Sequence, residues 1–351
     1  MGNKSNKILL VSPVPPPIGG IASWTVDYIE KMSDLQQPVC VVNSSVVGKR
    51  IDNTSKVSIF DEIKRLLNIR NEIKREVKLS SPSVIHYNAS CFTMGLIRDY
   101  LVLCAFWKRV PVVYQCHCNL ETNVNNRLSR FLFKRISANV KLVLALNKKS
   151  ARFAKEFTKD VDVIPNFIKS IPEKRITISN ELKNIVFVGR VTVEKGINEL
   201  LELAKKCPQY TIHIVGPDSS GLLEDNKLDN VIVYGAKTHE QVLEIICKQD
   251  ALILPSYSEG FPLVIMEGMA VGLPILATPV GSIPDMIEDK GGVLFGVGDI
   301  DSMICAIEKM SSRSVREGMA SFNNAKVREK YSSDIVLKDL IQIYKNIGKE
   351  I

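Results

Sequence analysis

The sequence predicts two consecutive α/β domains, each built on a parallel sheet with helices on both faces. The chain has 351 residues, and this length suits two domains of roughly 100 to 200 residues better than one core. Short apolar segments alternate with longer amphipathic segments along both halves, which is typical of a doubly wound sheet. Near the middle, a stretch of about twenty residues with polar clusters interrupts the alternation and indicates a linker.

In each half, the apolar segments predict strands and the amphipathic segments predict helices. In the first half, strands are expected at 7–12, 38–43, 83–87, 111–115 and 142–146, and helices at 21–33, 61–78, 94–107 and 125–137. In the second half, strands are expected at 184–190, 210–216, 230–235, 250–256, 273–279 and 291–296, and helices at 194–206, 238–247, 262–271 and from about 299 onward.

These elements predict an N-terminal Rossmann-like domain at 1–167, a linker at 168–183, a second Rossmann-like domain at 184–330 and a terminal helix at 331–351. Ligands of open parallel sheets bind beyond the carboxyl ends of the strands. We therefore expect the two domains to face each other across one cleft.

The composition, with 45% hydrophobic and 24% charged residues, is that of a globular protein in water. The N-terminal apolar run is shorter than a signal-peptide core, and no later run approaches the ~18 residues of a membrane span. The eight cysteines form no C-x-x-C pair, which favours reduced thiols. We expect a cytoplasmic protein.

Positive charge is concentrated in the first half. Residues 1–165 hold 25 Lys and Arg against 13 Asp and Glu, a net charge of +12, and the remainder has a net charge of −4. The excess lies in two amphipathic segments, 63–78 and 127–135, which are either solvated helix faces or surfaces attracted to an anionic acceptor or to the inner face of the cell membrane. Nucleic acid is not expected as a partner, because aromatic residues are not interleaved with these cations.

The segment 255–274, PSYSEGFPLVIMEGMAVGLP, places Glu259 and Glu267 around a Gly-Phe-Pro turn. We expect Pro262 in the first turn of a helix, with the amides of Gly260 and Phe261 and the positive end of the helix dipole free to bind phosphate. A carboxylate accepts hydrogen bonds from a vicinal diol. An acid on each side of a diphosphate site therefore fits a nucleotide sugar, although the spacing alone is also explained by a helix packed on a sheet.

Two features of the first half could approach the same ligand. Gly19 and Gly20 follow a strand and precede a helix, where they either let backbone amides approach phosphate or form a tight turn. His117 follows another strand, between Cys116 and Cys118. A metal site is not expected there, because strand alternation points the thiols away from the imidazole and no second cluster completes a tetrahedron.

The segment SEGFPLVIMEGMAVGLPILAT closely resembles the donor-binding signature of the family-4 retaining glycosyltransferases, which have the two-domain GT-B fold. FVGRVTVEKGINELL (187–201) is similar to the G-R-x4-K-G segment of that family, and IPNF (164–167) resembles its interdomain hinge. The last segment resembles the terminal helix that crosses back to the N-terminal, acceptor-side domain.

The resemblance implies a role for each matching residue. Arg190 and Lys195 would stabilise the leaving diphosphate, and Glu259 and His117 would orient the sugar. Gly216 would leave room for the nucleotide, and the backbone of Tyr234 to Ala236 would lie near the base. The implied donor-binding set is Gly19, Gly20, Gly216, Tyr234, Gly235, Ala236, Gly260, Phe261, Pro262, Leu263 and Glu267.

The resemblance further implies transfer from a nucleotide sugar, UDP- or GDP-linked, to a hydroxyl of a glycan or a polyprenyl-diphosphate-linked acceptor during the synthesis of a surface polysaccharide such as capsule or lipopolysaccharide. It implies no metal and no cofactor. Front-face attack, in which the leaving phosphate takes the acceptor proton, would give retention without a protein base.

Three other functions compete with this one. A nucleotide-sugar epimerase or hydrolase of the same fold would release or convert the sugar without transferring it. A glycoside hydrolase using Glu259 and Glu267 would leave Arg190 and Lys195 unexplained. A non-catalytic nucleotide-binding protein at the membrane surface would not need both cations and both glutamates.

Overall fold

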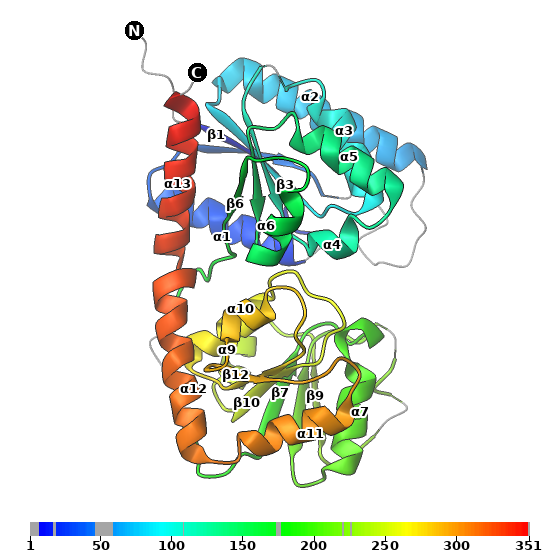
Figure 1. Ribbon diagram of the computed structural model, residues 1–351, viewed down its shortest axis with the longest axis vertical. Helices are drawn as coiled ribbons and strands as arrows, with labels where there is room; N and C mark the ends of the chain where they lie inside the picture. The colour runs from blue at the N-terminus through cyan, green and yellow to red at the C-terminus, as the bar shows by residue number, and fades with distance from the viewer. Residues whose placement is uncertain are drawn as a thin grey trace. The chain divides into compact units, whose positions relative to one another are not determined.

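The computed structural model describes residues 7–16, 19–45, 59–107, 109–172, 177–219, 221–224 and 227–349 (Figure 1). The chain forms two compact units, the first made of Met1–Lys169 with Ser333–Ile351 and the second of Ser170–Ser332. These divisions lie close to the expected positions at 167 and 331.

The first unit contains a parallel six-stranded sheet in the order β2-β1-β3-β4-β5-β6. Its strands are β1 (Ile8–Ser12), β2 (Val39–Asn43), β3 (Val84–Ala89), β4 (Val112–Cys116), β5 (Leu142–Ala145) and β6 (Val161–Val163). Its helices are α1 (Gly20–Asp34), α2 (Ile59–Ser80), α3 (Thr93–Leu103), α4 (Leu120–Asn123), α5 (Arg127–Ser137), α6 (Lys148–Ala154) and α13 (Ser333–Lys349).

Alternation along each strand divides the core of the first unit between the two faces of the sheet. On one face, Leu9 and Val11 of β1 pack with α2, α3, α5 and α6. On the other face, Ile8 and Leu10 pack with α1 and α13. Burial on both faces explains why these strands are continuous apolar runs in the sequence.

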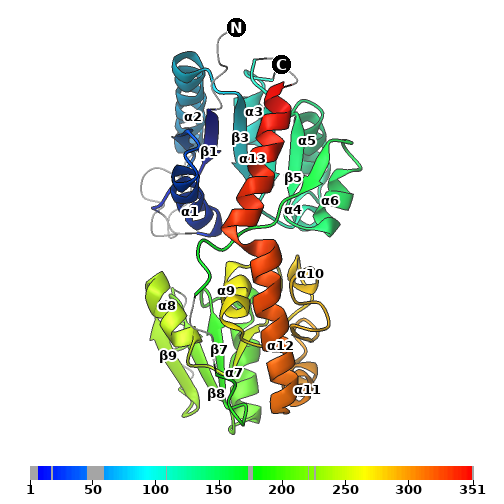
Figure 2. The same ribbon diagram turned by 90° about the vertical axis from the view of Figure 1, so that its left-hand side faces the viewer.

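Helix α13 completes the first unit although it lies at the end of the chain, and Figure 2 shows it crossing the sheet of this unit. The Tyr344 hydroxyl lies 3.1 Å from the Tyr28 hydroxyl of α1 and forms a short hydrogen bond with Nδ1 of His86 in β3. All three side chains are buried. The terminal helix is therefore fixed to both α1 and the sheet.

The second unit has a parallel six-stranded sheet in the order β12-β11-β10-β7-β8-β9. Its strands are β7 (Asn184–Val188), β8 (Thr211–Val215), β9 (Val231–Gly235), β10 (Ala251–Leu254), β11 (Ile275–Ala277) and β12 (Gly292–Leu294). Its helical elements are η2 (Val193–Lys195), α7 (Ile197–Lys206), α8 (His239–Ile246), α9 (Leu263–Val271), α10 (Ile283–Ile287), α11 (Ile300–Lys309), α12 (Arg313–Lys326) and η3 (Val327–Tyr331).

Two helix starts differ from the predictions. The helix expected at 194–206 is split, because Gly196 adopts a left-handed conformation (φ 77°) between the 3₁₀ turn η2 and α7. The helix expected to include Pro262 begins at Leu263. Pro262 is its N-cap in an extended conformation (φ −70°, ψ 116°), and its carbonyl accepts a hydrogen bond from the Ile265 amide.

Among the described residues, no helix combines the length and the apolar character that a membrane crossing needs.

The attachment of α13 gives a first prediction. Tyr344→Phe removes the hydroxyl that bonds His86 and leaves a buried imidazole nitrogen without that partner. We expect a loss of about 1 to 3 kcal/mol in the free energy of unfolding, measured by urea denaturation.

Tyr331→Phe is the matched control, because Tyr331 is also buried and contacts Phe261 through its ring. This control should change stability by less than about 0.5 kcal/mol. Equal losses in the two variants would show that the Tyr344 hydroxyl contributes nothing specific.

Candidate functional site

The sheet of the second unit reverses its winding direction beside β7. The chain passes from β7 through α7 to β8 on one side, whereas β10 lies on the other side of β7. The loops that follow β7 and β10 therefore diverge at the carboxyl ends of neighbouring strands, which is where open α/β sheets bind ligands.

Glycines let these loops come together closely. A Cβ at Gly196, after β7, would lie 2.3 Å from the carbonyl oxygen of Pro255, after β10. A Cβ at Gly281, after β11, would lie 2.0 Å from the carbonyl oxygen of Glu259. Both glycines have positive φ, so any side chain would also strain the backbone. The local sequence thus brings three loops into backbone contact.

Lys195 and Glu259 form an ion pair across this junction. The Lys195 Nζ atom lies 2.6 Å from Oε1 of Glu259, and Ser256 Oγ donates to the same oxygen at 2.7 Å. The Glu259 side chain is only 10% exposed, so these two donors compensate the removal of its charge from water. Because both donors use Oε1, Oε2 remains as an acceptor.

The ammonium group of Lys195 contacts Glu259, which precedes the first residue of α9 by four positions, and Arg190 follows the end of β7 by two positions. Arg190 is exposed, and Glu194 lies close enough to interact with its charge. The Phe261 side chain is buried against Tyr331, with ring centroids 5.4 Å apart, so its contribution to a ligand is limited to the backbone. Cations and a helix N-terminus together favour an anionic ligand.

Glu267 points toward α8, a helix in which the sequence predicts no site residue. Its Oε1 lies 3.4 Å from Nδ1 of His239, the first residue of α8. Glu267 is half-buried and His239 is exposed. Their separation of 28 positions gives no spacing signal, and the indication in the sequence is that His239 stands shortly after a strand end.

Gly216 is also required by the packing of the protein itself. A Cβ at this position would lie 1.8 Å from the carbonyl oxygen of Gly189, so the space that the missing side chain leaves is occupied by the β7 loop. The Gly216 amide also donates to the Gly235 carbonyl at 2.9 Å. The Tyr234 hydroxyl lies 3.0 Å from Nδ1 of His213, so this side chain is engaged within the protein. The backbone of Gly235 and Ala236 is the accessible part of the chain after β9.

In the first unit, Gly19 is the extended N-cap of α1 and Gly20 is its first residue. Among the described residues, no heavy atom lies within 4 Å of a Cβ placed at either position. Packing inside the protein therefore does not require these glycines, and the start of α1 is sterically open.

His117 follows β4 and is held by the neighbouring strand. Its Nε2 lies 3.0 Å from Oδ1 of Asn88, while the Asn88 amide nitrogen donates to Ser12 Oγ at 2.9 Å. This arrangement puts the proton on Nε2 and leaves Nδ1 as an acceptor. The imidazole ring also packs edge-on against the Trp24 ring, and the two ring centroids are 5.1 Å apart. Burial, with the neighbouring His86 as the smaller cause, lowers the pKa of His117 to about 3.

The thiols beside His117 lie on the opposite face of the sheet. Cys116 and Cys118 are buried in the core under α3 and α5 with Cys91, whereas His117 contacts Trp24 on the α1 face. All eight cysteines are free. The described residues contain no group of three or more His, Cys, Asp or Glu side chains arranged to hold a metal ion.

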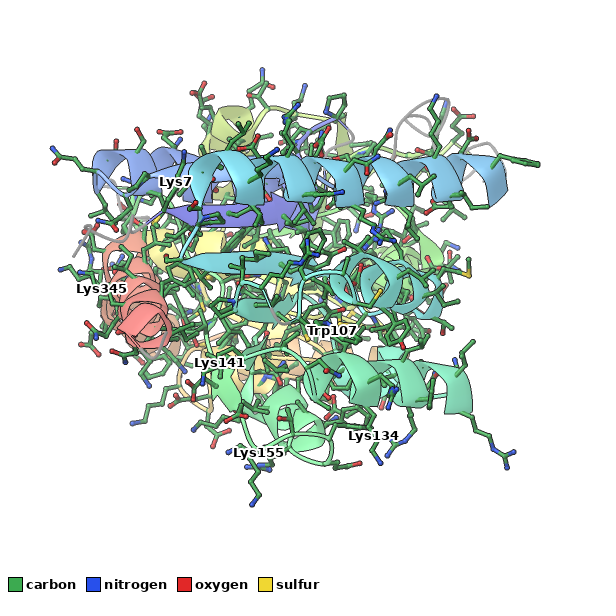
Figure 3. The ribbon with its side chains drawn as sticks, turned by 90° about the horizontal axis from the view of Figure 1, so that it is seen from above. Lys7, Trp107, Lys134, Lys141, Lys155 and Lys345 are labelled. Carbon is green, nitrogen blue, oxygen red and sulfur yellow. The ribbon has the colours of Figure 1, made fainter. Side chains whose placement is uncertain are left out.

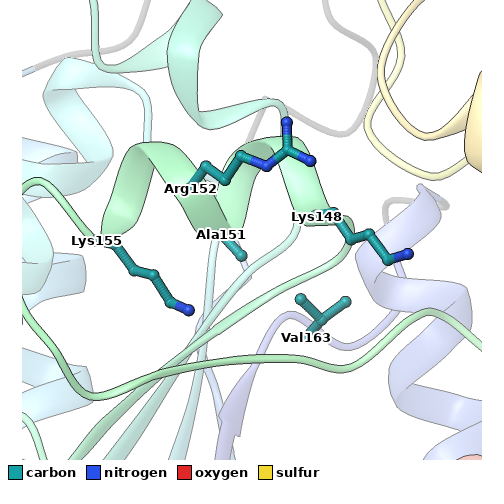
Figure 4. Close-up of a pocket in the computed structure, with 5 residues that line it drawn as sticks. All are labelled: Lys148, Ala151, Arg152, Lys155 and Val163. Carbon is teal, nitrogen blue, oxygen red and sulfur yellow. The ribbon is translucent and has the colours of Figure 1, made fainter.

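Two surface depressions lie away from these residues. One, of about 190 Å³, lies on α6 and is lined by Lys148, Ala151, Arg152, Lys155 and Val163 (Figure 4). Its three cationic side chains extend in different directions, so they do not converge on one anion. The other, of about 560 Å³, lies at the opposite end of the second sheet and involves Lys205, Thr211 and Asn230.

Two family models together match most of the chain. The model described as "Glycosyltransferase Family 4" matches residues 18–170, and the model "Glycosyl transferases group 1" matches residues 170–327. The point where the models meet coincides with the division between the two units.

Similar proteins include an uncharacterised 41.2 kDa protein in the cps region of Klebsiella pneumoniae, which is 32% identical over 48% of this chain and 48% of its own. A putative teichuronic acid biosynthesis glycosyltransferase of Bacillus subtilis is 30% identical over 51% of this chain and 49% of its own. The matched segment thus spans about half the length of these relatives. The crystal structure of Anabaena HepE with UDP and glucose superposes with a TM-score of 0.70 over 96% of this chain and 99% of that one, at 16% identity.

The environment of His117 predicts a pH dependence. An unfolded histidine has a pKa near 6.5, whereas the pKa in the folded protein is about 3. Between these values the unfolded chain binds a proton that the folded protein does not, so stability falls as the pH falls, by up to about 1.4 kcal/mol per pH unit.

We expect wild-type protein to lose about 1 to 2 kcal/mol more than His117→Gln when urea unfolding is measured at pH 5.0 instead of 7.5. Parallel pH profiles for the two proteins would mean that His117 is not held neutral.

Proposed function

Because the chain belongs to the family-4 glycosyltransferases and has their GT-B fold, we propose that it transfers a sugar from a nucleotide donor to a hydroxyl group with retention at the anomeric carbon. The observation that carries this proposal is the Lys195–Glu259 pair at the switch point of the second sheet. A cation, a carboxylate and a helix N-terminus there match the diphosphate and the sugar of one ligand.

In the proposed complex, the diphosphate lies at the start of α9 between Arg190 and Lys195. Glu259 keeps Lys195 in place through Oε1 and accepts a sugar hydroxyl through Oε2. Glu267 accepts hydrogen bonds from the ribose diol, and His239 lies close enough to contact the same ribose. The backbone of Gly235 and Ala236 lies toward the base, and Gly260 and Leu263 supply amides.

The chemical step breaks the bond from the anomeric carbon to the phosphate oxygen and forms a bond to the acceptor oxygen on the same face. The acceptor proton passes to the departing phosphate oxygen. Arg190 and Lys195 stabilise the charge that grows on that phosphate. Within the first unit, neutral His117 keeps Nδ1 as an acceptor for a hydroxyl group, and Gly19 and Gly20 leave the amides at the start of α1 sterically accessible.

The donor we propose is UDP- or GDP-linked, and the UDP and glucose in the similar Anabaena structure support uridine. The acceptor we propose is a glycan or a polyprenyl-diphosphate-linked sugar of a surface polysaccharide. Similarity to proteins of the cps region and of teichuronic acid synthesis supports this assignment. Transfer of a labelled sugar to a lipid or glycan, as opposed to release of free sugar, distinguishes it from an epimerase or a hydrolase.

A thermal-shift panel of nucleotide sugars tests the donor site. A donor at 100 times its Kd should stabilise the folded protein by about 2.7 kcal/mol. Glu267→Gln should bind the same donor about ten- to a hundredfold more weakly, as expected for the loss of hydrogen bonds to a charged group.

Glu244→Gln is the matched control, because Glu244 is exposed on α8 and makes the same change of charge nearby. This variant should bind like wild type. The proposal is wrong if no nucleotide sugar shifts the melting temperature, and the role of Glu267 is wrong if both variants bind the donor equally well.

A further inference from the structure

The two basic helices of the first unit differ once their contacts are known. Helix α2 contains six cations and four acidic residues. Its Arg65 is turned inward, donating to the Ser44 carbonyl and pairing with Glu62 at 3.4 Å. Helix α5 contains four cations and no acidic residue. Helix α5 therefore has the higher net charge, although α2 also exposes five cations, namely Lys64, Arg70, Lys74, Arg75 and Lys78.

The outward face of α5 combines cations with large apolar side chains. Residues 129, 132, 133, 136 and 137 are buried, and every other residue of the helix is exposed. The exposed set consists of Arg127, Leu128, Arg130, Phe131, Lys134 and Arg135. Phe131 is 57% exposed, so the packing of the core does not explain why this position carries a phenylalanine.

The start of α3 extends this surface. Helix α3 packs between α2 and α5, and Figures 1 and 2 show the three helices side by side. Asn126, the N-cap of α5, donates to Thr93, the first residue of α3, at 3.0 Å. Phe92 and Met94 flank Thr93 and are 62% and 67% exposed. Four large apolar side chains thus share one surface with the cations of α5.

Single exposed apolar residues are ordinary, but a group of them on one surface marks a binding face. We propose that Phe92, Met94, Leu128 and Phe131 insert into the interfacial region of an anionic bilayer, with Arg127 and Lys134 against the lipid phosphates. An anionic bilayer fits because it offers negative charge and an apolar layer together, as amphipathic helices at membrane interfaces require. This inference does not depend on the proposed transfer reaction.

Insertion predicts two separable contributions to binding, measured by co-sedimentation of the full chain with vesicles. The electrostatic part requires anionic lipid and weakens as salt shortens the Debye length. The apolar part persists at high salt. Wild type should therefore bind phosphatidylcholine vesicles containing phosphatidylglycerol far better than pure phosphatidylcholine, and should retain measurable binding in about 0.5 M salt.

Double variants, each with a matched control, separate the apolar contribution to vesicle binding from the electrostatic one. Met94→Ser/Phe131→Ser should lower the partition coefficient about tenfold and remove the binding that resists salt. The apolar control, Val26→Ser/Ile335→Ser, changes two exposed side chains on α1 and α13 and should bind like wild type.

Arg127→Gln/Lys134→Gln should lower binding at low salt about tenfold or more. The charge control, Lys338→Gln/Lys345→Gln, removes the same charge from exposed positions on α13. Figure 3 shows Lys345 and Lys134 on separate sides of the first unit. This control should change binding less than twofold.

The inference is overturned if wild type ignores anionic vesicles at low salt, or if either control pair weakens binding as much as its test pair. It is equally overturned if Met94→Ser/Phe131→Ser binds vesicles normally but converts a dimer into a monomer in light scattering, because the face would then join two copies of the chain. Circular dichroism melts should be unchanged for all four variants, since the substituted side chains are exposed.

Discussion

The ion pair between Lys195 and Glu259 is the interaction on which the site in the second unit depends. It links the loops that follow β7 and β10, at the point where Gly196 lets the backbone of one loop approach Pro255 of the other. A half-buried lysine and a nearly buried carboxylate are each costly to remove from water, but together with Ser256 they satisfy one another. The pair therefore positions a cation before any ligand arrives, and such preorganised charge is what stabilises a leaving group.

The two units contribute different chemistry. The second unit offers cations, carboxylates and open amides at one sheet edge, whereas the first offers a neutral imidazole on the α1 face and a basic, apolar surface on the α5 face. These two faces of the first unit are separated by the sheet itself. Contact with a membrane through α5 would therefore leave His117 and the start of α1 uncovered, as a lipid-linked acceptor would require.

Much of the fold could be predicted from the sequence, because strands buried on both faces appear as continuous apolar runs and helices as amphipathic ones. Every strand that the sequence predicted is present. The additional strand β6 (Val161–Val163) was not anticipated, because Asp162 interrupts its apolar residues. The break before α7 was missed because a helix-breaking conformation at Gly196 is set by contact with Pro255, which lies far along the chain. The family relationship could also be predicted, from the segments around Arg190 and Glu267.

The details of the site could be predicted less well. Nothing in the sequence links His239 to Glu267, and nothing in it shows that the Gly189 carbonyl approaches Gly216 too closely for a side chain. Charge counts also do not reveal contacts within the basic helices, such as the bond from Arg65 of α2 to the Ser44 carbonyl and the ion pair between Arg130 of α5 and Glu156. Such contacts join residues distant in sequence, so only the folded structure shows them.

The central claim, that Lys195 stabilises the departing phosphate, is tested most directly by kcat for donor turnover in Lys195→Ala, with Lys205→Ala on the exposed part of α7 as the control. Because a preorganised cation matters most as charge develops, we predict a fall in kcat of about a hundredfold or more while the donor still binds. The control should turn over like wild type. A Lys195→Ala enzyme with unchanged kcat and only a raised KM would contradict the account, since Lys195 would then bind the donor without stabilising its departure.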